Sequence, residues 1–187
     1  LQATAFEVLE PVADGETWNV VSTRFPTPAS LPSFLVSAWL RIASRVGPSA
    51  LWPILLDGAL LLGCAQLDDT VDVLETFTDR CPQQRIPSSH FEALARRLEA
   101  CPSIAARARL LKWFGSLAGQ EEVLTLLAEQ LQHDEAVVRH GAVLGLLRLN
   151  TQGAREHIVR HAPHEADAEV RATLTGFMSS SHGDSPT

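Results

Sequence analysis

Several residue types are scarce or missing in this chain. It has no Tyr, and aromatic residues make up only 6% of its 187 residues. A β-sandwich or β-barrel would need many β-branched and aromatic residues in short alternating runs, so this scarcity disfavours both folds. Hydrophobic residues, mostly Leu and Ala, make up 45% of the chain, which is enough to form a helical core. The chain as a whole is therefore not disordered.

Cysteine is equally scarce. Cys64, Cys81 and Cys101 are odd in number and show no CxxC spacing, which disfavours a disulfide framework. We therefore expect reduced, buried thiols and a cytoplasmic, reducing compartment. The first residue is Leu rather than Met, which indicates a fragment or a processed product, and a signal removed before residue 1 would leave no trace.

Positive charge and long apolar runs are also limited. Lys112 is the sole lysine, and 15 basic residues stand against 22 acidic ones, for a formal charge of −7. Nucleic-acid binding needs clustered Lys and Arg, so we expect no nucleic-acid partner. The longest apolar run, residues 50–65, is interrupted by Pro53 and Asp57, so no membrane span is predicted.

The two ends of the chain differ from its middle. Residues 1–29 are predicted to form an N-terminal arm, which is either extended or a β-hairpin with its turn at Asp14-Gly15. An irregular arm lying on the helical body is the alternative. Residues 180–187 are small and polar and are predicted to be a disordered tail. The intervening residues 30–179 are predicted to form a single α-helical domain.

An internal repeat organises the second half of the chain. Arg107, Arg139 and Arg171 lie 32 residues apart, and apolar residues recur at −1, +3 and +7 from each Arg. These offsets define one helical face. The helices before them show the same period, so each unit is predicted to be helix, turn, helix. Stacked copies bury the apolar faces that a single hairpin would leave exposed.

Residues 131–147 combine an inter-helix Asp134 with Val138-Arg139 and a small Ala142. This pattern resembles the HEAT repeat. The resemblance implies a short right-handed α-solenoid with three HEAT-like hairpins over residues 88–179. It also implies that the motif residues join neighbouring repeats and are structural; they are Arg107, Asp134, Arg139 and Arg171. Residues 30–82 lack the Val-Arg signature and are interpreted as degenerate N-terminal repeats, or alternatively as a separate helical unit.

Five of the seven histidines lie between residues 133 and 164, which raises the question of a metal site. His157 and His161 share a helical face, and His164-Glu165 follows. However, no HExxH motif is present and Pro163 interrupts the helix. His164-Glu165 and the Val-Arg-His at 138–140 are similar to motifs of deoxyhypusine hydroxylase, a HEAT-like di-iron enzyme, but the required set of His-Glu pairs is missing. We therefore expect no metal and no cofactor.

Other catalytic interpretations also lack support. HEAT-like DNA glycosylases need a basic surface and aromatic residues, and Arg107 to Trp113 is surrounded in sequence by acidic helices. No local motif of a Ser-His-Asp or Cys-His enzyme and no glycine-rich phosphate loop is present. We expect no catalytic residues. A metal-dependent or nucleic-acid-modifying enzyme on the same scaffold remains the alternative function.

The repeat surface is the remaining candidate for function. In such solenoids the second helices line the concave side, and the 32-residue alignment places Lys112, Leu144 and Arg148 in its solvent-facing stripes, with Trp113 beside them. We interpret these four as binding residues for a protein or peptide. Alternatively, Trp113 and Phe177 only pack between repeats. The predicted function is a non-catalytic interaction module; a purely structural subunit is a further possibility, and neither the partner nor the oligomeric state is specified.

Overall fold

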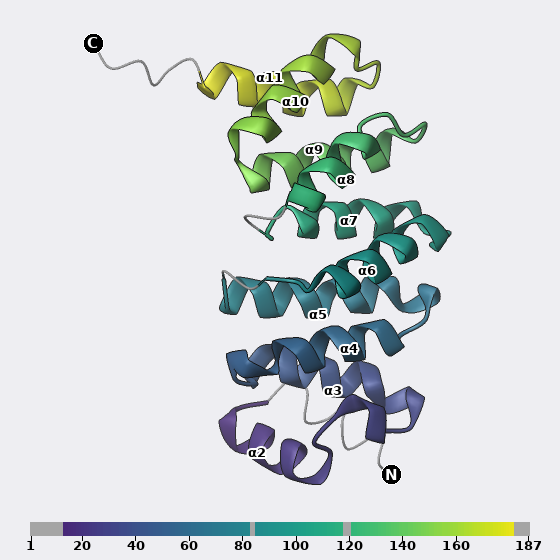
Figure 1. Ribbon diagram of the computed structural model, residues 1–187, viewed down its shortest axis with the longest axis vertical. Coiled ribbons are helices and arrows are strands. Elements are labelled where there is room, and N and C mark those ends of the chain that lie inside the picture. The colour runs from purple at the N-terminus through teal and green to yellow at the C-terminus, as the bar shows by residue number, and fades with distance from the viewer. Residues whose placement is uncertain (1–12, 83–84, 118–120, 182–187) are drawn as a thin grey trace, which may run out of the picture. The chain divides into compact units, whose positions relative to one another are not determined.

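The computed structural model describes residues 13–82, 85–117 and 121–181, and all regular structure in these ranges is helical. The prediction of an all-α fold built from helical hairpins is confirmed. The α-helices are α2 (Gly15–Arg24), α3 (Ser33–Val46), α4 (Trp52–Leu61), α5 (Leu67–Arg80), α6 (Ser88–Ala100), α7 (Ile104–Phe114), α8 (Glu121–Gln130), α9 (Ala136–Leu149), α10 (Gln152–His161) and α11 (Ala168–Ser181). Figure 1 labels them in chain order.

The described residues divide into two compact units, the first ending at Pro102 and the second starting at Ser103. The boundary between the units falls inside the first predicted hairpin, and the single domain over residues 30–179 stays a prediction. α6 belongs to the first unit and α7 to the second. Pro102 lies at the junction and cannot donate a backbone hydrogen bond, so no helix continues across it.

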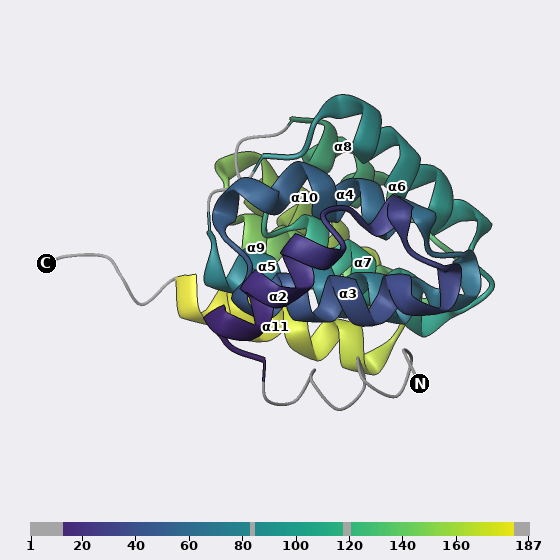
Figure 2. The same ribbon diagram turned by 90° about the horizontal axis from the view of Figure 1, so that it is seen from below.

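In the first unit the helices pack in two layers. α3 lies against α5, and α4 lies against α6 in the other layer (Figure 2). The core is built around two tryptophans that are almost fully buried: Trp39, and Trp52, which stacks on Phe77 with ring centroids 5.4 Å apart. Each indole N–H donates to a backbone carbonyl, Trp39 to Phe25 at 2.9 Å and Trp52 to Arg85 at 2.7 Å. The polar edge of each buried ring is thereby satisfied.

The prediction of an extended or β-hairpin arm is wrong for residues 15–24, which form α2. Asp14 does not occupy a hairpin turn. Its carboxylate accepts a 2.8 Å hydrogen bond from the backbone N–H of Thr17 and so caps the helix. Trp18 and Val21, three residues apart on one helical face, are both buried, and the Trp18 ring meets Trp39 edge-on at 5.5 Å. Residues 1–12 of the predicted arm lie outside the described residues.

The second unit also has two layers, with α7, α9 and α11 in one and α8 and α10 in the other (Figure 2). The predicted periodic positions form its core. The column before each Arg is Ala106, Val138 and Val170, and none of these side chains is more than 1% exposed. The column three residues after each Arg, occupied by Leu110, Ala142 and Leu174, is completely buried.

Two further observations concern the ends of the chain and the membrane. α11 continues to Ser181, so the helix enters the predicted tail of residues 180–187, and residues 182–187 lie outside the described part. Among the helices of the described ranges, none combines the length and the apolar character that crossing a membrane requires.

Candidate interaction surface

Three glycines allow α7 and α9 to pack unusually closely. A Cβ added to Gly141 would lie 2.5 Å from the Cα of Ala108, and one added to Gly145 would lie 2.6 Å from the carbonyl oxygen of Leu111. A Cβ on Gly115 would overlap the backbone of Gly145. The two backbones therefore touch along several turns, and any larger residue at these positions would push the helices apart.

This contact fixes which side chains share the solvent-facing side of the two helices. Ala108 and Leu111 meet Gly141 and Gly145, so α7 and α9 run parallel and in register. Each residue of a helix is rotated by 100° from the last, so the residue after Leu111 and the residue before Gly145 point to the same side. These residues are Lys112 and Leu144. We call this side the α7–α9 face, made up of Arg109, Lys112, Val137, Leu144 and Arg148.

The exposure of these side chains agrees with this geometry. Lys112 and Arg148 are exposed, and Leu144 is half-buried. Val137, two turns before Leu144, is 51% exposed. Trp113 does not belong to the face: it is fully buried and packs against Phe114 at a centroid distance of 5.3 Å. The interpretation of Trp113 as a binding residue is therefore corrected, because it faces the core. Phe177, its counterpart in α11, is half-buried.

The helices of the second unit differ in charge, and α10 and α11 carry both signs. α7 and α9 contain Arg and Lys but neither Asp nor Glu; their basic residues are Arg107, Arg109, Lys112, Arg139 and Arg148. α8, in the opposite layer, contains Glu121, Glu122 and Glu129 and no basic residue. The α7–α9 face is therefore basic in a chain whose formal charge is −7.

At one end of α9, Arg139 joins two successive hairpins. Its guanidinium donates through Nε to Glu165 Oε2 at 2.9 Å and through Nη2 to Glu165 Oε1 at 2.7 Å. Nη1 donates to the backbone carbonyls of His133 at 2.9 Å and Asp134 at 2.8 Å. Glu165 lies between α10 and α11, so one side chain links the turn before α9 to the turn before α11. Such bidentate pairs are among the stronger hydrogen-bonded contacts in proteins.

Glu165 is fully enclosed by its partners. Besides Arg139, its carboxylate contacts His161 Nε2 at 2.9 Å and accepts the backbone N–H of Asp167 at 2.8 Å. The side chain of Glu165 has no exposed surface. The hydrogen bonds from Arg139 lower the pKa of Glu165 from 4.5 to about 2, although burial acts in the opposite direction. The same hydrogen bonds raise the pKa of Arg139.

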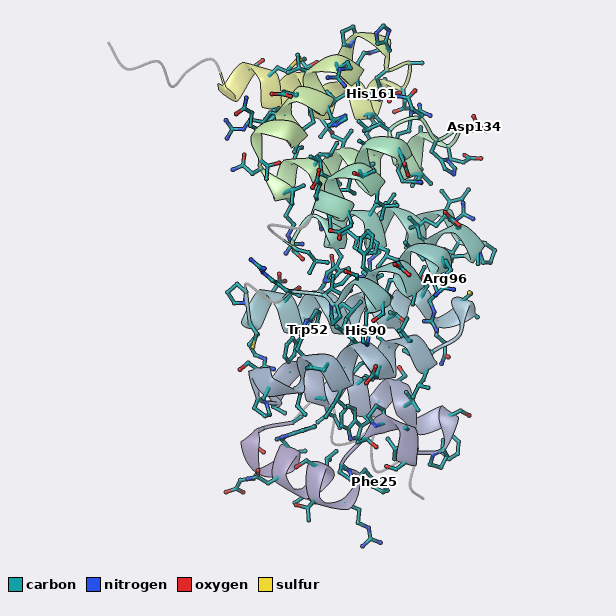
Figure 3. The ribbon with its side chains drawn as sticks, viewed as in Figure 1. Phe25, Trp52, His90, Arg96, Asp134 and His161 are labelled. Carbon is teal, nitrogen blue, oxygen red and sulfur yellow. The ribbon has the colours of Figure 1, made fainter. Side chains whose placement is uncertain are left out.

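The other motif residues are placed differently. Arg171 donates to the backbone carbonyl of Glu165 at 3.3 Å. The Asp134 side chain is exposed, and Asp134 contributes its backbone carbonyl to Arg139 (Figure 3). Arg107 is half-buried in the first turn of α7. The side-chain partner of Arg139 is Glu165. In the sequence, Glu165 stands out only as the neighbour of His164 in a possible metal motif.

The family model of HEAT repeats matches residues 91–176. This part of the chain is a HEAT-repeat segment. It starts in α6 and ends in α11, within the residues 88–179 over which the resemblance was drawn. No curated protein and no solved structure matches the chain. HEAT repeats generally mediate protein–protein interaction and scaffolding, and the family is typically non-enzymatic.

Most of the clustered histidines lie around one cleft of the HEAT-repeat segment. His133, His161 and His164 line a cavity of about 310 Å³ together with Arg139 and Glu165. His161 is labelled in Figure 3 at this end of the second unit. In the described residues, no group of three or more His, Cys, Asp or Glu side chains is arranged to hold a metal ion. Within this cleft, His161 is engaged by Glu165 in the contact between hairpins, with 2.9 Å between Nε2 and the carboxylate.

His140 belongs to a contact inside the layer of second helices. Its Nε2 lies 3.1 Å from Thr173 Oγ1, and its Nδ1 lies 3.8 Å from a carboxylate oxygen of Glu169. Both partners are on α11, so His140 links α9 to α11. His140 therefore belongs to the contact between α9 and α11 and not to the α7–α9 face.

Proposed function

We propose that this chain is a non-catalytic interaction module that binds a protein or peptide on the α7–α9 face. The observation that carries the proposal is the half-buried Leu144 beside the exposed basic side chains of Lys112 and Arg148. Arg is among the residues enriched in binding hot spots, which lie in well-packed surroundings from which water is excluded. The general role of HEAT repeats in protein–protein contacts supports the same assignment.

The rigidity of the two helices supports this role. Because the α7 and α9 backbones touch at Gly141 and Gly145, the side chains that each helix presents are held at a fixed spacing. A surface that is already ordered loses little conformational entropy when a partner binds. Toward α11, His140 of α9 is engaged by Thr173.

The proposed setting is a reducing compartment. Cys64, Cys81 and Cys101, which all lie in the described part of the chain, form no disulfide, and Cys101 is completely buried. The formal charge of −7 supports a protein partner over a nucleic acid.

Photo-crosslinking from the face tests the proposal. p-Benzoylphenylalanine is placed at position 144, irradiated in extract of the source cells, and the crosslinked product is identified by mass spectrometry. The matched control carries the same probe at Val159, which is 56% exposed on α10 in the other layer. We expect a discrete protein adduct from position 144 that is missing from position 159.

The double substitution Lys112→Glu/Arg148→Glu in the probe-bearing chain should abolish that adduct, because both charges border the probe. Equal adducts from positions 144 and 159, or no adduct from 144, would show that the α7–α9 face is not a binding surface.

A further inference from the structure

We propose that the α7–α9 face recognises an acidic peptide segment that carries two apolar side chains about 10 Å apart. This inference rests on the proposed function and names the chemistry of the partner. It follows from two observations about the face: the sign of its charges and the spacing of its apolar residues.

The charge of the face sets the charge of the partner. Lys112 and Arg148 are exposed on either side of Leu144, and Arg109 adds a half-exposed guanidinium one turn before Lys112. The acidic residues of this unit's first helices, such as Glu121 and Glu122, lie on α8 in the opposite layer. A carboxylate-rich segment therefore meets complementary charge along α7 and α9 and repulsion along α8, whereas α10 carries Arg155 and Arg160 beside Glu156.

The apolar residues set the spacing. Val137 and Leu144 are seven residues apart in α9, so their side chains lie on one side of the helix about 10 Å apart along its axis. A peptide in the polyproline II conformation advances about 3.1 Å per residue with three residues per turn, so apolar side chains three positions apart lie on one face of it and match this distance. Acidic residues at the other positions of such a peptide would lie near Lys112 and Arg148.

The favoured occupant is a peptide rather than a nucleic acid. Phosphate binding depends on several cations spread along a groove, whereas this face alternates basic groups with the apolar Val137 and Leu144. Among the described residues, the aromatic side chain nearest in sequence to Lys112 is Trp113, and it is buried, so it offers no base-stacking platform.

Fluorescence anisotropy with defined probes tests the inference. The first probe is a labelled peptide of sequence EDLEDLED, in which the two leucines are three positions apart. The second replaces every acid by Lys, the third replaces both leucines by Ser, and the fourth is a labelled twelve-nucleotide oligothymidylate. All are titrated with the full chain. We expect the first probe to bind at least about tenfold more tightly than each of the others.

Two double variants locate the binding. Lys112→Glu/Arg148→Glu should weaken binding of the first peptide by about tenfold or more. Arg155→Glu/Arg160→Glu makes the same change in net charge at exposed residues of α10, in the other layer, and should change the affinity by less than about twofold. Leu144→Ser keeps the charge of the face and should lower the affinity for the first peptide toward the affinity of the wild type for the third probe.

Several outcomes would overturn the inference. These are equal or tighter binding of the lysine peptide, equal or tighter binding of the oligonucleotide, an equal effect of the two double variants, or no binding of the acidic peptide. The photo-crosslinking experiment separates this failure from that of the proposed function. A protein captured at position 144 through a segment that is not acidic would retain the proposed function and remove the inferred partner chemistry.

Discussion

Individual side chains that satisfy buried backbone groups contribute much of the specificity of this fold. Arg139 and Glu165 join two hairpins in the second unit. In the first unit, Arg97 donates to the carbonyls of Ala59, at 2.8 Å, and Leu60, which lie in the last turn of α4. The last carbonyls of a helix have no partner within it, so Arg97 supplies donors at the end of α4, whereas Arg139 donates to the carbonyls of His133 and Asp134 in the turn before α9.

Glu165 should make the stability of the protein depend on acid. Its pKa is about 2 in the folded chain and about 4.5 when unfolded. A carboxyl whose folded pKa is depressed stabilises the fold above pH 4.5, and this contribution is lost as the pH falls from about 4.5 to 2. In urea unfolding, the free energy of unfolding of Glu165→Gln should be lower than that of the wild type by about 2 to 3 kcal/mol at pH 7. This difference in free energy should shrink toward zero near pH 2.

The matched control for this pH series is Glu129→Gln. Glu129 is exposed on α8, so its replacement should change the free energy of unfolding by less than about 0.5 kcal/mol at every pH. A difference between the wild type and Glu165→Gln that stays constant from pH 7 to pH 2 would contradict a role for the ionised carboxylate.

Adjacent arginines on α6 allow a second comparison. Arg97→Ala should cost about 1.5 to 3 kcal/mol, because the carbonyls of Ala59 and Leu60 would lose their donors in a half-buried site. Arg96 is exposed, as Figure 3 shows, and Arg96→Ala should cost less than about 0.5 kcal/mol. Chemical denaturation measures the free energy of unfolding of both variants. An equal decrease in the two would show that the contacts of Arg97 with α4 are not stabilising.

At the scale of the helices, the periodic hydrophobicity predicted the buried positions correctly, whereas the turn signal at Asp14-Gly15 predicted the wrong structure. The buried columns that start at Ala106 and Leu110 follow from the 32-residue repeat and the 3.6-residue period of a helix. Asp14-Gly15 misled the prediction because Asp precedes Gly both in hairpin turns and at helix N-termini. The burial of Trp18 against Trp39, which selects the helix, depends on residues distant in sequence.

The glycine contact between α7 and α9 yields a prediction at this scale. Gly141→Ala and Gly145→Ala place a Cβ against backbone atoms of α7 that cannot move away independently of the helix. Each substitution should destabilise the fold by about 1 to 3 kcal/mol, although Ala normally favours helices. Thermal unfolding followed by circular dichroism measures the loss.

Gly176 provides the matched control, since it lies inside α11 and no atom lies within 4 Å of an added Cβ. Gly176→Ala should stabilise the fold by about 0.5 to 1 kcal/mol through helix propensity alone. If Gly141→Ala were also stabilising, the close approach of α7 and α9 would not be required for the fold.

At the scale of the whole molecule, the distribution of charge carries information that composition cannot. The formal charge of −7 suggests a uniformly acidic surface. The basic character of the α7–α9 face becomes visible only once α8 is known to lie in the opposite layer. For the same reason, Lys112, Leu144 and Arg148 could be selected from the repeat alignment, whereas the burial of Trp113 and the pairing of Arg139 with Glu165 depend on contacts between helices.

This contrast between net charge and local charge predicts how salt affects binding of the acidic peptide. The net charge of −7 repels the approaching peptide within about 10 Å, the Debye length at 0.1 M salt, and attraction by Lys112 and Arg148 acts at contact. Raising salt from about 0.05 to 0.5 M weakens both effects, so the association rate should change by less than about twofold while the dissociation rate rises about fivefold. Stopped-flow anisotropy measures both rates. Lys112→Gln/Arg148→Gln should remove most of the salt dependence of dissociation, because these two side chains then carry no charge for salt to screen. An association rate that falls tenfold with salt would mean that the basic face, and not the acidic body, dominates the field that an approaching partner meets.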